Sequence, residues 1–161
     1  MPKRLPHAYF EASVFIAILK HEVIDGHERW RHCRGLLKDA EEGKIVAVTS
    51  SFTVTEVTGG RRGRPTSEVA DQIRGFFEND FVLSVDIDRT IASKAQEHVW
   101  DFGLKAPDAI HLASAVAAEC DVFYTYDDDL LDIKAKVHSI RIEQPIWHGA
   151  SQLEMDVASD D

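Results

Sequence analysis

Short apolar runs alternate along this chain with segments whose apolar residues recur at helical spacing. The runs are rich in β-branched and aromatic side chains, which predicts strands. They are HAYF (7–10), KIVAV (44–48), FVLSVD (81–86), VFYT (122–125) and SIRI (139–142). Strands that alternate with helices pack as a parallel sheet covered on both faces. We therefore predict an α/β protein with three layers, α/β/α, around a central, mainly parallel sheet of about five strands.

Start and stop signals frame the predicted helices. Ser13 lies near the start of the first helix, and Gly43 and Gly103 end two later ones, where glycine tolerates the left-handed conformation of a helix end. Pro107 suits the first turn of another helix, because its missing N–H costs nothing there. The helix predicted after Thr66 carries an apolar stripe. That stripe consists of Val69, Ile73, Phe76 and Phe77.

The length of 161 residues favours one domain with a core of its own. We predict a folded domain over residues 1–147 and an acidic, flexible tail over 148–161. No apolar stretch approaches the ~20 residues that cross a bilayer. Lys3 and Arg4 precede an apolar run as in a secretory signal, but Glu11 interrupts that run and no cleavage site follows. We expect a cytoplasmic protein that does not associate with membranes.

Four acidic residues stand at the ends or edges of apolar segments. Glu11 closes HAYFE, Glu56 lies within SSFTVTEV, Asp108 opens APDAIHLASAV, and Asp127 follows VFYTY. A carboxylate placed against core-forming sequence must be paired or bound to a cation. Ligands of parallel sheets bind beyond the carboxyl ends of the strands, where Glu11 and Asp127 are expected. The pattern predicts an oxygen-lined site for a divalent cation and a metal-dependent phosphodiesterase.

Other kinds of site find little support in the sequence. Cys33 and Cys120 lie far apart, and the eight histidines form no HExxH motif, so no zinc site is expected. The net charge of −10 argues against a protein that coats DNA. No Ser–His–Asp or Cys–His arrangement suggests a side-chain nucleophile.

Four motifs resemble the PIN-domain family, and most closely its VapC-type toxins. The resemblance extends over about residues 7–145. Its strongest element surrounds Asp108, and the acidic position of the second motif falls on Glu56. The motifs are YFEASVFIAIL (9–19), TSSFTVTEV (49–57), LKAPDAIHLASAV (104–116) and FYTYDDDLL (123–131). The resemblance implies an endoribonuclease that depends on Mg²⁺ or Mn²⁺ and leaves 5′-phosphate and 3′-hydroxyl ends.

The resemblance also implies roles for the acidic residues. Glu11 and Asp108 would hold the principal ion, directly or through water. Glu56 and Asp127 would complete the cluster by orienting water or holding a second ion. Asp128 and Asp129 are reserves, because the run of three aspartates leaves the register open. One or two ions are expected.

Two hydroxyl groups and a basic loop would support this site. Ser13 and Thr125 are expected to hydrogen-bond the carboxylates or the scissile phosphate. Arg61, Arg62 and Arg64 lie in a glycine-rich loop soon after Glu56. They are candidates for substrate binding, although a solvated turn explains them equally well.

By the same resemblance, the partners would be RNA and an antitoxin. We expect tRNA or rRNA as substrate, a VapB-like antitoxin protein, and a homodimer. A metal phosphodiesterase acting on DNA flaps ranks last, because the chain leaves little room for the clamps that such enzymes carry. The sequence leaves open whether the chain is a toxin or a free-standing nuclease.

Glu11 is the main departure from the family pattern, in which aspartate is usual. It supports an alternative, a catalytically impaired PIN-like module that binds RNA or protein. Each acid also has a structural explanation: Asp108 and Asp127 suit helix starts, and Glu56 suits a solvated helix face. His111 is interpreted as a packing or hydrogen-bonding histidine rather than a catalytic base.

Overall fold

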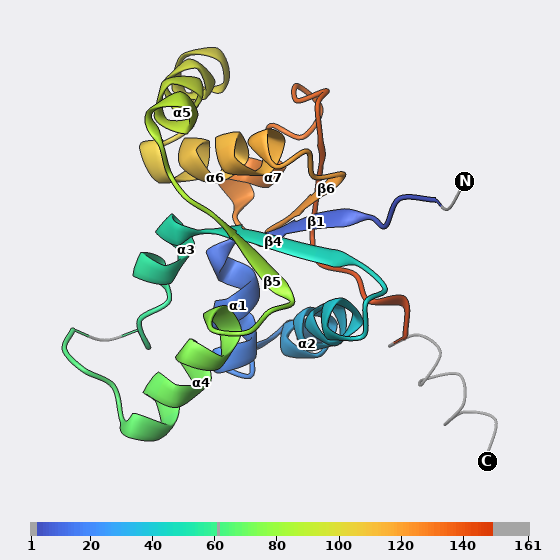
Figure 1. Ribbon diagram of the computed structural model, residues 1–161, viewed down its shortest axis with the longest axis vertical. Coiled ribbons are helices and arrows are strands. Elements are labelled where there is room, and N and C mark those ends of the chain that lie inside the picture. The colour runs from blue at the N-terminus through green and yellow to red at the C-terminus, as the bar shows by residue number, and fades with distance from the viewer. Residues whose placement is uncertain (1–2, 61, 150–161) are drawn as a thin grey trace.

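A five-stranded parallel sheet forms the centre of the molecule (Figure 1). The computed structural model describes residues 3–60 and 62–149. The strand order is β5-β4-β1-β6-β7, and every neighbouring pair is parallel. The strands are β1 (His7–Phe10), β4 (Val46–Ser50), β5 (Val82–Val85), β6 (Val122–Tyr124) and β7 (Arg141–Glu143). The predicted fold class is confirmed. Most of the predicted tail, residues 150–161, lies outside the described part of the chain.

Helices cover both faces of this sheet. On one face lie α1 (Ala12–Leu19), α2 (Arg29–Glu41) and α4 (Ser67–Phe77). On the other lie α5 (Arg89–Phe102), α6 (Ala106–Ala117) and the short α7 (Asp128–Leu131), with α5 packed on α6 (Figure 1). The remaining helix, α3 (Ser51–Glu56), begins where β4 ends. Within the described residues, no helix is both long enough and apolar enough to span a membrane.

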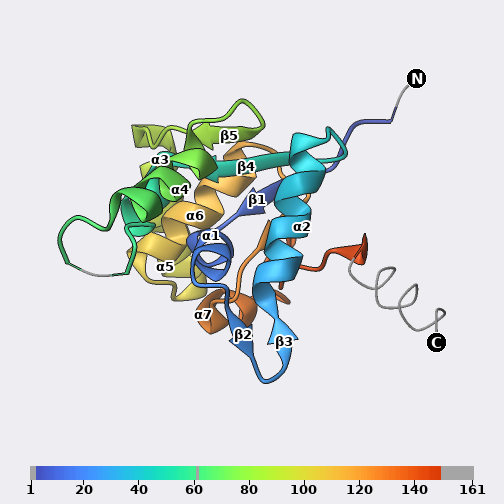
Figure 2. The same cartoon turned by 90° about the horizontal axis from the view of Figure 1, so that it is seen from below.

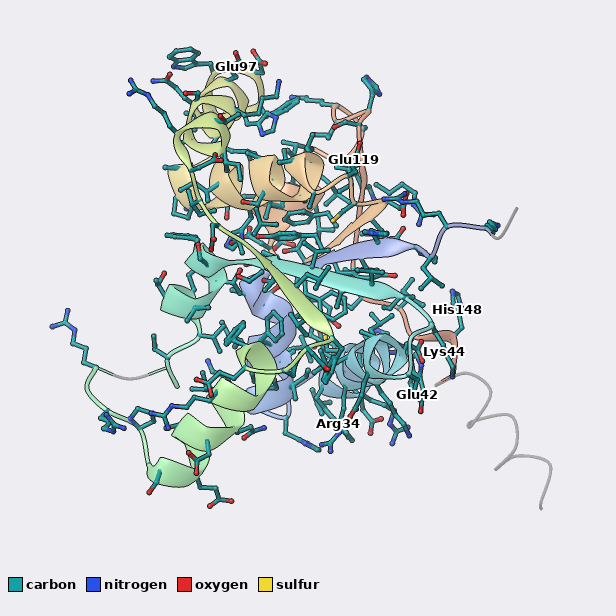
Figure 3. All side chains as sticks on the ribbon, in the orientation of Figure 1. Arg34, Glu42, Lys44, Glu97, Glu119 and His148 are labelled. Atoms are coloured by element: carbon teal, nitrogen blue, oxygen red, sulfur yellow. The ribbon has the colours of Figure 1, made fainter. Side chains whose placement is uncertain are left out.

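Alternation along the strands produces two apolar cores, one on each face. Tyr9 of β1 and Phe123 of β6 face the α5–α6 layer and stack with ring centroids 5.0 Å apart. Their neighbours Ala8 and Phe10 face the opposite layer. Successive strand side chains point to opposite faces, so a strand buried on both sides must be apolar throughout. The apolar runs of the sequence therefore match the sheet, whereas charged residues such as Arg34 on α2 and Glu97 on α5 lie on the outer surfaces (Figure 3).

A two-stranded hairpin interrupts the path from α1 to α2, and the sequence analysis did not predict it. It pairs β2 (Val23–Ile24) with β3 (His27–Glu28) in antiparallel register and projects beyond the helices (Figure 2). Asp25 and Gly26 form its turn, both with positive φ. An Asp–Gly pair is a strong indication of such a turn. The strands escaped prediction because each has only two residues.

The strand order creates a crevice between β1 and β6. From β1 the chain continues to β4 and β5 on one side of the sheet, and it later returns to β6 on the other side. Such a reversal leaves space beyond the carboxyl ends of the two central strands. Glu11 follows β1, and its N–H donates to the carbonyl of Tyr124, the last residue of β6. The candidate residues are thus brought to one edge of the sheet.

Candidate functional site

Glu11 is held in place by three hydrogen bonds to one of its oxygens. It is the N-cap of α1, and its Oε2 accepts from the N–H of Ser13 at 3.1 Å. The hydroxyls of Ser13 and Thr125 donate to the same oxygen, Thr125 at 2.9 Å. Among the described residues, no donor reaches Oε1. The longer glutamate stem therefore folds back as a cap while one oxygen stays available.

The same two hydroxyls connect Glu11 to the segment after β6. The N–H of Tyr126 donates to Ser13 Oγ at 2.9 Å, and the N–H of Asp127 donates to Thr125 Oγ1 at 2.9 Å. Each hydroxyl thus accepts from one backbone and donates to the carboxylate. This arrangement fixes the start of α7 relative to the start of α1.

Asp108 has the opposite surroundings. It lies in the first turn of α6 and is only 8% exposed. No hydrogen-bond donor stabilises its carboxylate within the described part of the chain. Burial, reinforced by the nearby carboxylates of Asp127 and Glu11, raises the pKa of Asp108 to about 6. A buried carboxylate without a partner, beside other carboxylates, is a place where a cation would be strongly favoured.

Asp127 and Asp129 lie beside Asp108 at the start of α7. Asp127 is the N-cap of this helix and accepts from the N–H of Asp129 at 2.9 Å. Asp129 is exposed, and its carboxylate lies 3.6 Å from the ammonium of Lys105. Asp127 and Asp129 are thus the two aspartates of the run that approach Asp108. Asp127 also has a structural role, because it caps α7.

Glu56 is bound by a histidine that the sequence analysis did not place in the site. At the end of α3, its Oε1 contacts Nε2 of His111, which is completely buried in α6. The other ring nitrogen, Nδ1, contacts the hydroxyl of Tyr9 at 2.7 Å. The interpretation of His111 as a hydrogen-bonding histidine is consistent with these contacts. Its partners are 55 and 102 residues away, so spacing could not reveal them.

The donor atoms fall into two adjoining groups that suit a divalent cation. In one, atoms of Glu11, Glu56 and His111 lie within 4.8 Å of one another. In the other, oxygens of Asp108, Asp127 and Asp129 do so. Carboxylate oxygens are the ligands that Mg²⁺ and Mn²⁺ prefer. The donor set therefore fits such an ion, and the carboxylate of Glu11, from the first group, contributes with Asp127 to the raised pKa of Asp108 in the second.

A cleft of about 380 Å³ gives access to these acids. Glu11, Glu56 and Asp127 line it together with Arg29 and Tyr126. The guanidinium of Arg29 lies 4.2 Å from the centre of the Tyr126 ring and also pairs with Glu22. Sequence analysis missed this arginine, because it begins α2 far from every motif.

The arginine-rich loop lies between α3 and α4, away from the acidic groups. Arg61 lies outside the described residues. Arg62 and Arg64 are exposed, and Arg64 lines a shallow depression against α4. Gly60 of the loop lies beside the side chain of Lys20, the C-cap of α1. Among the described residues of this loop, Arg62 and Arg64 do not line the cleft that the carboxylates share.

Comparison with known proteins agrees with this architecture. The family model described as PIN domain matches residues 8–136. A comparison with curated protein sequences yields no significant match.

Three solved structures share the fold at low sequence identity. A toxin–antitoxin complex from Klebsiella pneumoniae has 21% identity and a TM-score of 0.58, covering 86% of this chain and 97% of that one. VapBC2 from Rickettsia felis, bound to a fragment of its promoter DNA, has 14% identity and a TM-score of 0.61, covering 86% and 98%. VapC20 from Mycobacterium tuberculosis, a toxin that cleaves the sarcin–ricin loop, has 15% identity and a TM-score of 0.58, covering 83% and 98%. The family model spans most of the chain and the architecture agrees with it, so this chain belongs to the PIN-domain family.

Proposed function

We propose that this chain is a divalent-metal-dependent endoribonuclease. The observation that carries the proposal is the buried carboxylate of Asp108, which has no hydrogen-bond donor among the described residues and lies near Asp127 and Glu11, two acids that line the cleft. A soluble domain has no structural reason to keep such a group ionised without a cation. Family membership makes nuclease chemistry the natural use of that cation.

Mg²⁺ or Mn²⁺ is the ion that we propose. Asp108 and Glu11 would hold it, and Asp127 and Glu56 would complete the set directly or through water. When bound, such an ion supplies an activated water and neutralises charge on the phosphoryl oxygens. The products would carry 5′-phosphate and 3′-hydroxyl ends.

The chain's own residues would prepare the site for this chemistry. The hydroxyls of Ser13 and Thr125 hold Oε2 of Glu11 by hydrogen bonds, so the conformation of this longer side chain is fixed before an ion binds. Arg29 offers a positive group on the same cleft, where a phosphate of the substrate could pair with it. Arg61, Arg62 and Arg64 would contact RNA farther from the scissile bond.

We further propose that the chain is the toxin of a toxin–antitoxin pair. Support comes from the solved structures that share its fold, two of which are a toxin–antitoxin complex and VapBC2 with promoter DNA. A VapB-like antitoxin would be the partner, and the toxin would form a homodimer. The described cleavage of the sarcin–ricin loop by VapC20 makes structured rRNA a first substrate to test, with tRNA as the second.

The test is a cleavage assay of the purified full-length chain on end-labelled rRNA and tRNA. We expect cleavage with Mg²⁺ or Mn²⁺, none with a chelator, and none for Asp108→Asn. Asp101→Asn is the matched control, because Asp101 is an exposed acid of α5 outside both acidic groups. Equal cleavage by Asp108→Asn and wild type would contradict the proposal. RNA binding without cleavage at any metal concentration would favour the alternative, a PIN-like module that has lost catalysis.

A further inference from the structure

A fully buried polar network lies beneath Glu56. The side chains of Tyr9, Thr53 and His111 are inaccessible to solvent, as are those of Thr49 and Ser50. Buried polar groups destabilise a core unless they are hydrogen-bonded. Here His111 is bonded to Tyr9, and Thr53 is bonded to Thr49 and Ser50. Thr49 Oγ1 contacts Thr53 Oγ1 at 2.8 Å and the carbonyl of Phe10 at 2.8 Å. The network joins β1, β4, α3 and α6 directly behind the cleft.

The direction of the bonds around His111 follows from its two partners. An ionised carboxylate only accepts hydrogen bonds, so Nε2 of His111 must carry a proton to bond Glu56. In a neutral imidazole, Nδ1 is then an acceptor, and the hydroxyl of Tyr9 donates to it. The core therefore selects one tautomer of His111, with its N–H directed at Glu56.

Stability alone does not explain this arrangement. The ring of His111 is fully buried and packs against the rings of Tyr9 and Phe52, where an aliphatic side chain would pack without polar atoms. Its outward contact is Glu56, which lines the cleft and keeps a side-chain exposure of 30%. Within the described residues, His111 is the one hydrogen-bond partner of the Glu56 side chain. A polar connection thus runs from the sheet core to one catalytic candidate.

We propose that His111 is a positioning residue that orients Glu56 toward the metal site, with Tyr9 fixing the tautomer. The role rests on the proposed function, because it concerns how one carboxylate is presented to the cation. His111 itself need not touch metal or RNA. It acts as carboxylate–histidine pairs do around many metal sites, where loss of the outer partner lowers metal affinity or activity about 10- to 100-fold.

The test is a double-mutant cycle between His111 and Glu56. The single variants His111→Leu and Glu56→Gln and the double variant are compared for Mn²⁺ affinity, measured from free Mn²⁺ by electron paramagnetic resonance, and for kcat and KM of RNA cleavage. We expect His111→Leu to lose about 10- to 100-fold in Mn²⁺ affinity. The double variant should be no worse than Glu56→Gln alone, because the effect of His111 passes through Glu56. The proposal would be overturned if the loss of Mn²⁺ affinity in the double variant equalled the product of the losses in the two single variants.

A conservative variant separates positioning from folding. The amide nitrogen of glutamine can take the place of Nε2, so His111→Gln should recover Mn²⁺ affinity to within about threefold of wild type. Urea unfolding of each variant shows whether it is folded. Failure of a folded His111→Gln variant to recover affinity above that of His111→Leu would overturn the positioning role.

The tautomer provides a readout that does not depend on activity. Nitrogen-15 NMR of the histidine ring should show a protonated Nε2 and an unprotonated Nδ1, and Tyr9→Phe should shift the Nδ1 signal. The opposite tautomer in wild type would overturn the proposal. Wild-type protein that neither binds Mn²⁺ nor cleaves RNA would overturn the proposed function, whereas active wild type with a multiplicative cycle overturns the role of His111 alone.

Discussion

Glu11 and Asp108 are both buried acids of one site, yet the fold treats them in opposite ways. Glu11 receives three hydrogen bonds and caps a helix. Asp108 receives none within the described residues and carries a raised pKa. The first carboxylate is held in place by hydrogen bonds, whereas burial and the neighbouring carboxylates disfavour the ionised form of the second.

This difference suggests that Glu11 provides a ligand of fixed geometry, whereas Asp108 and its neighbours attract the cation. The hydroxyls of Ser13 and Thr125 hold Glu11 in one geometry before any ion arrives. The field of Asp108, Asp127 and Glu11 supplies the electrostatic reason for a cation to enter. The hydrogen bonds of Glu11 stabilise the fold, whereas the buried charge of Asp108 destabilises it. Such a destabilising group is expected at a functional site.

The largest effect is expected for Asp108→Asn, which should lower RNA cleavage but raise the free energy of unfolding. Cleavage should fall by more than about 100-fold, because loss of a direct ligand exceeds the cost of losing an outer partner. Without metal at pH 7.5, the free energy of unfolding should rise by about 1 kcal/mol, because the unpaired charge is gone. Urea unfolding with a chelator measures it. A destabilised Asp108→Asn variant would contradict our view of this residue.

Glu11→Ala should instead lose both function and stability. It removes the acceptor of three hydrogen bonds and a helix cap, so the free energy of unfolding should fall by about 1–3 kcal/mol. Glu11→Gln is the matched variant, because its amide oxygen can still accept from Ser13 and Thr125. It should recover most of the stability but not the Mn²⁺ affinity. Equal destabilisation by both variants would show that the cap bonds contribute little.

Lowering the pH should weaken metal binding through Asp108. Below a pKa of about 6 this carboxyl takes up a proton that competes with the ion, so Mn²⁺ affinity should fall by up to about tenfold per pH unit. The metal-free protein should respond in the opposite sense. Because the folded pKa lies above the ordinary value of 3.8, the contribution of Asp108 to stability is present below that value and is lost as pH rises through about 6.

Titration calorimetry between pH 5 and 8 measures the first effect, and urea unfolding with a chelator measures the second. In Asp108→Asn, this part of the pH dependence of stability should disappear. An unchanged profile in that variant would assign the effect to another group.

Thr125→Val tests the hydroxyl connection with a change of similar volume. The variant breaks the link from the Asp127 backbone to Glu11, and Mn²⁺ affinity should fall about tenfold. Thr125→Ser keeps the hydroxyl and should remain within about threefold of wild type. Calorimetry distinguishes them, and a tolerant Thr125→Val variant would argue that the backbone alone fixes Glu11.

The smallest effects are expected for Arg62→Ala and Arg64→Ala. Both residues are exposed and lie outside the acidic groups, so each should weaken RNA binding only a few-fold. The loss should be similar for different RNA sequences, and the slope of log affinity against log salt should decrease by about one. Filter binding at several salt concentrations checks this. An unaffected slope would favour the solvated turn.

The sequence was sufficient for the fold because its apolar runs form the central strands β1, β4 and β6, which are buried on both sides. Runs such as HAYF and VFYT have no polar face to expose to solvent, which predicts buried strands. The helices between them lead to parallel pairing of these strands. The acids at their ends followed from the same reasoning, because chain reversal brings Glu11 and Asp127 to one crevice. Their catalytic roles remain predictions.

The contacts around these acids could not be predicted in the same way. Tyr9 is an ordinary strand aromatic in sequence, and only the packing of α6 across β1 gives its hydroxyl a histidine partner. Arg29 reaches the cleft because the β2–β3 hairpin sets the start of α2. Side-chain partners that are distant in sequence depend on tertiary packing, which local periodicity does not contain.

The most direct test of the account is a crystal structure of the Mn²⁺-soaked protein with anomalous data. We expect a Mn²⁺ peak in contact with oxygens of Asp108 and Glu11, at metal–oxygen distances of about 2.0–2.3 Å. Asp127 or Glu56 should lie within reach through water. A peak elsewhere on the surface, or no peak at saturating Mn²⁺ with both carboxylates ordered, would contradict a cation site at this edge of the sheet.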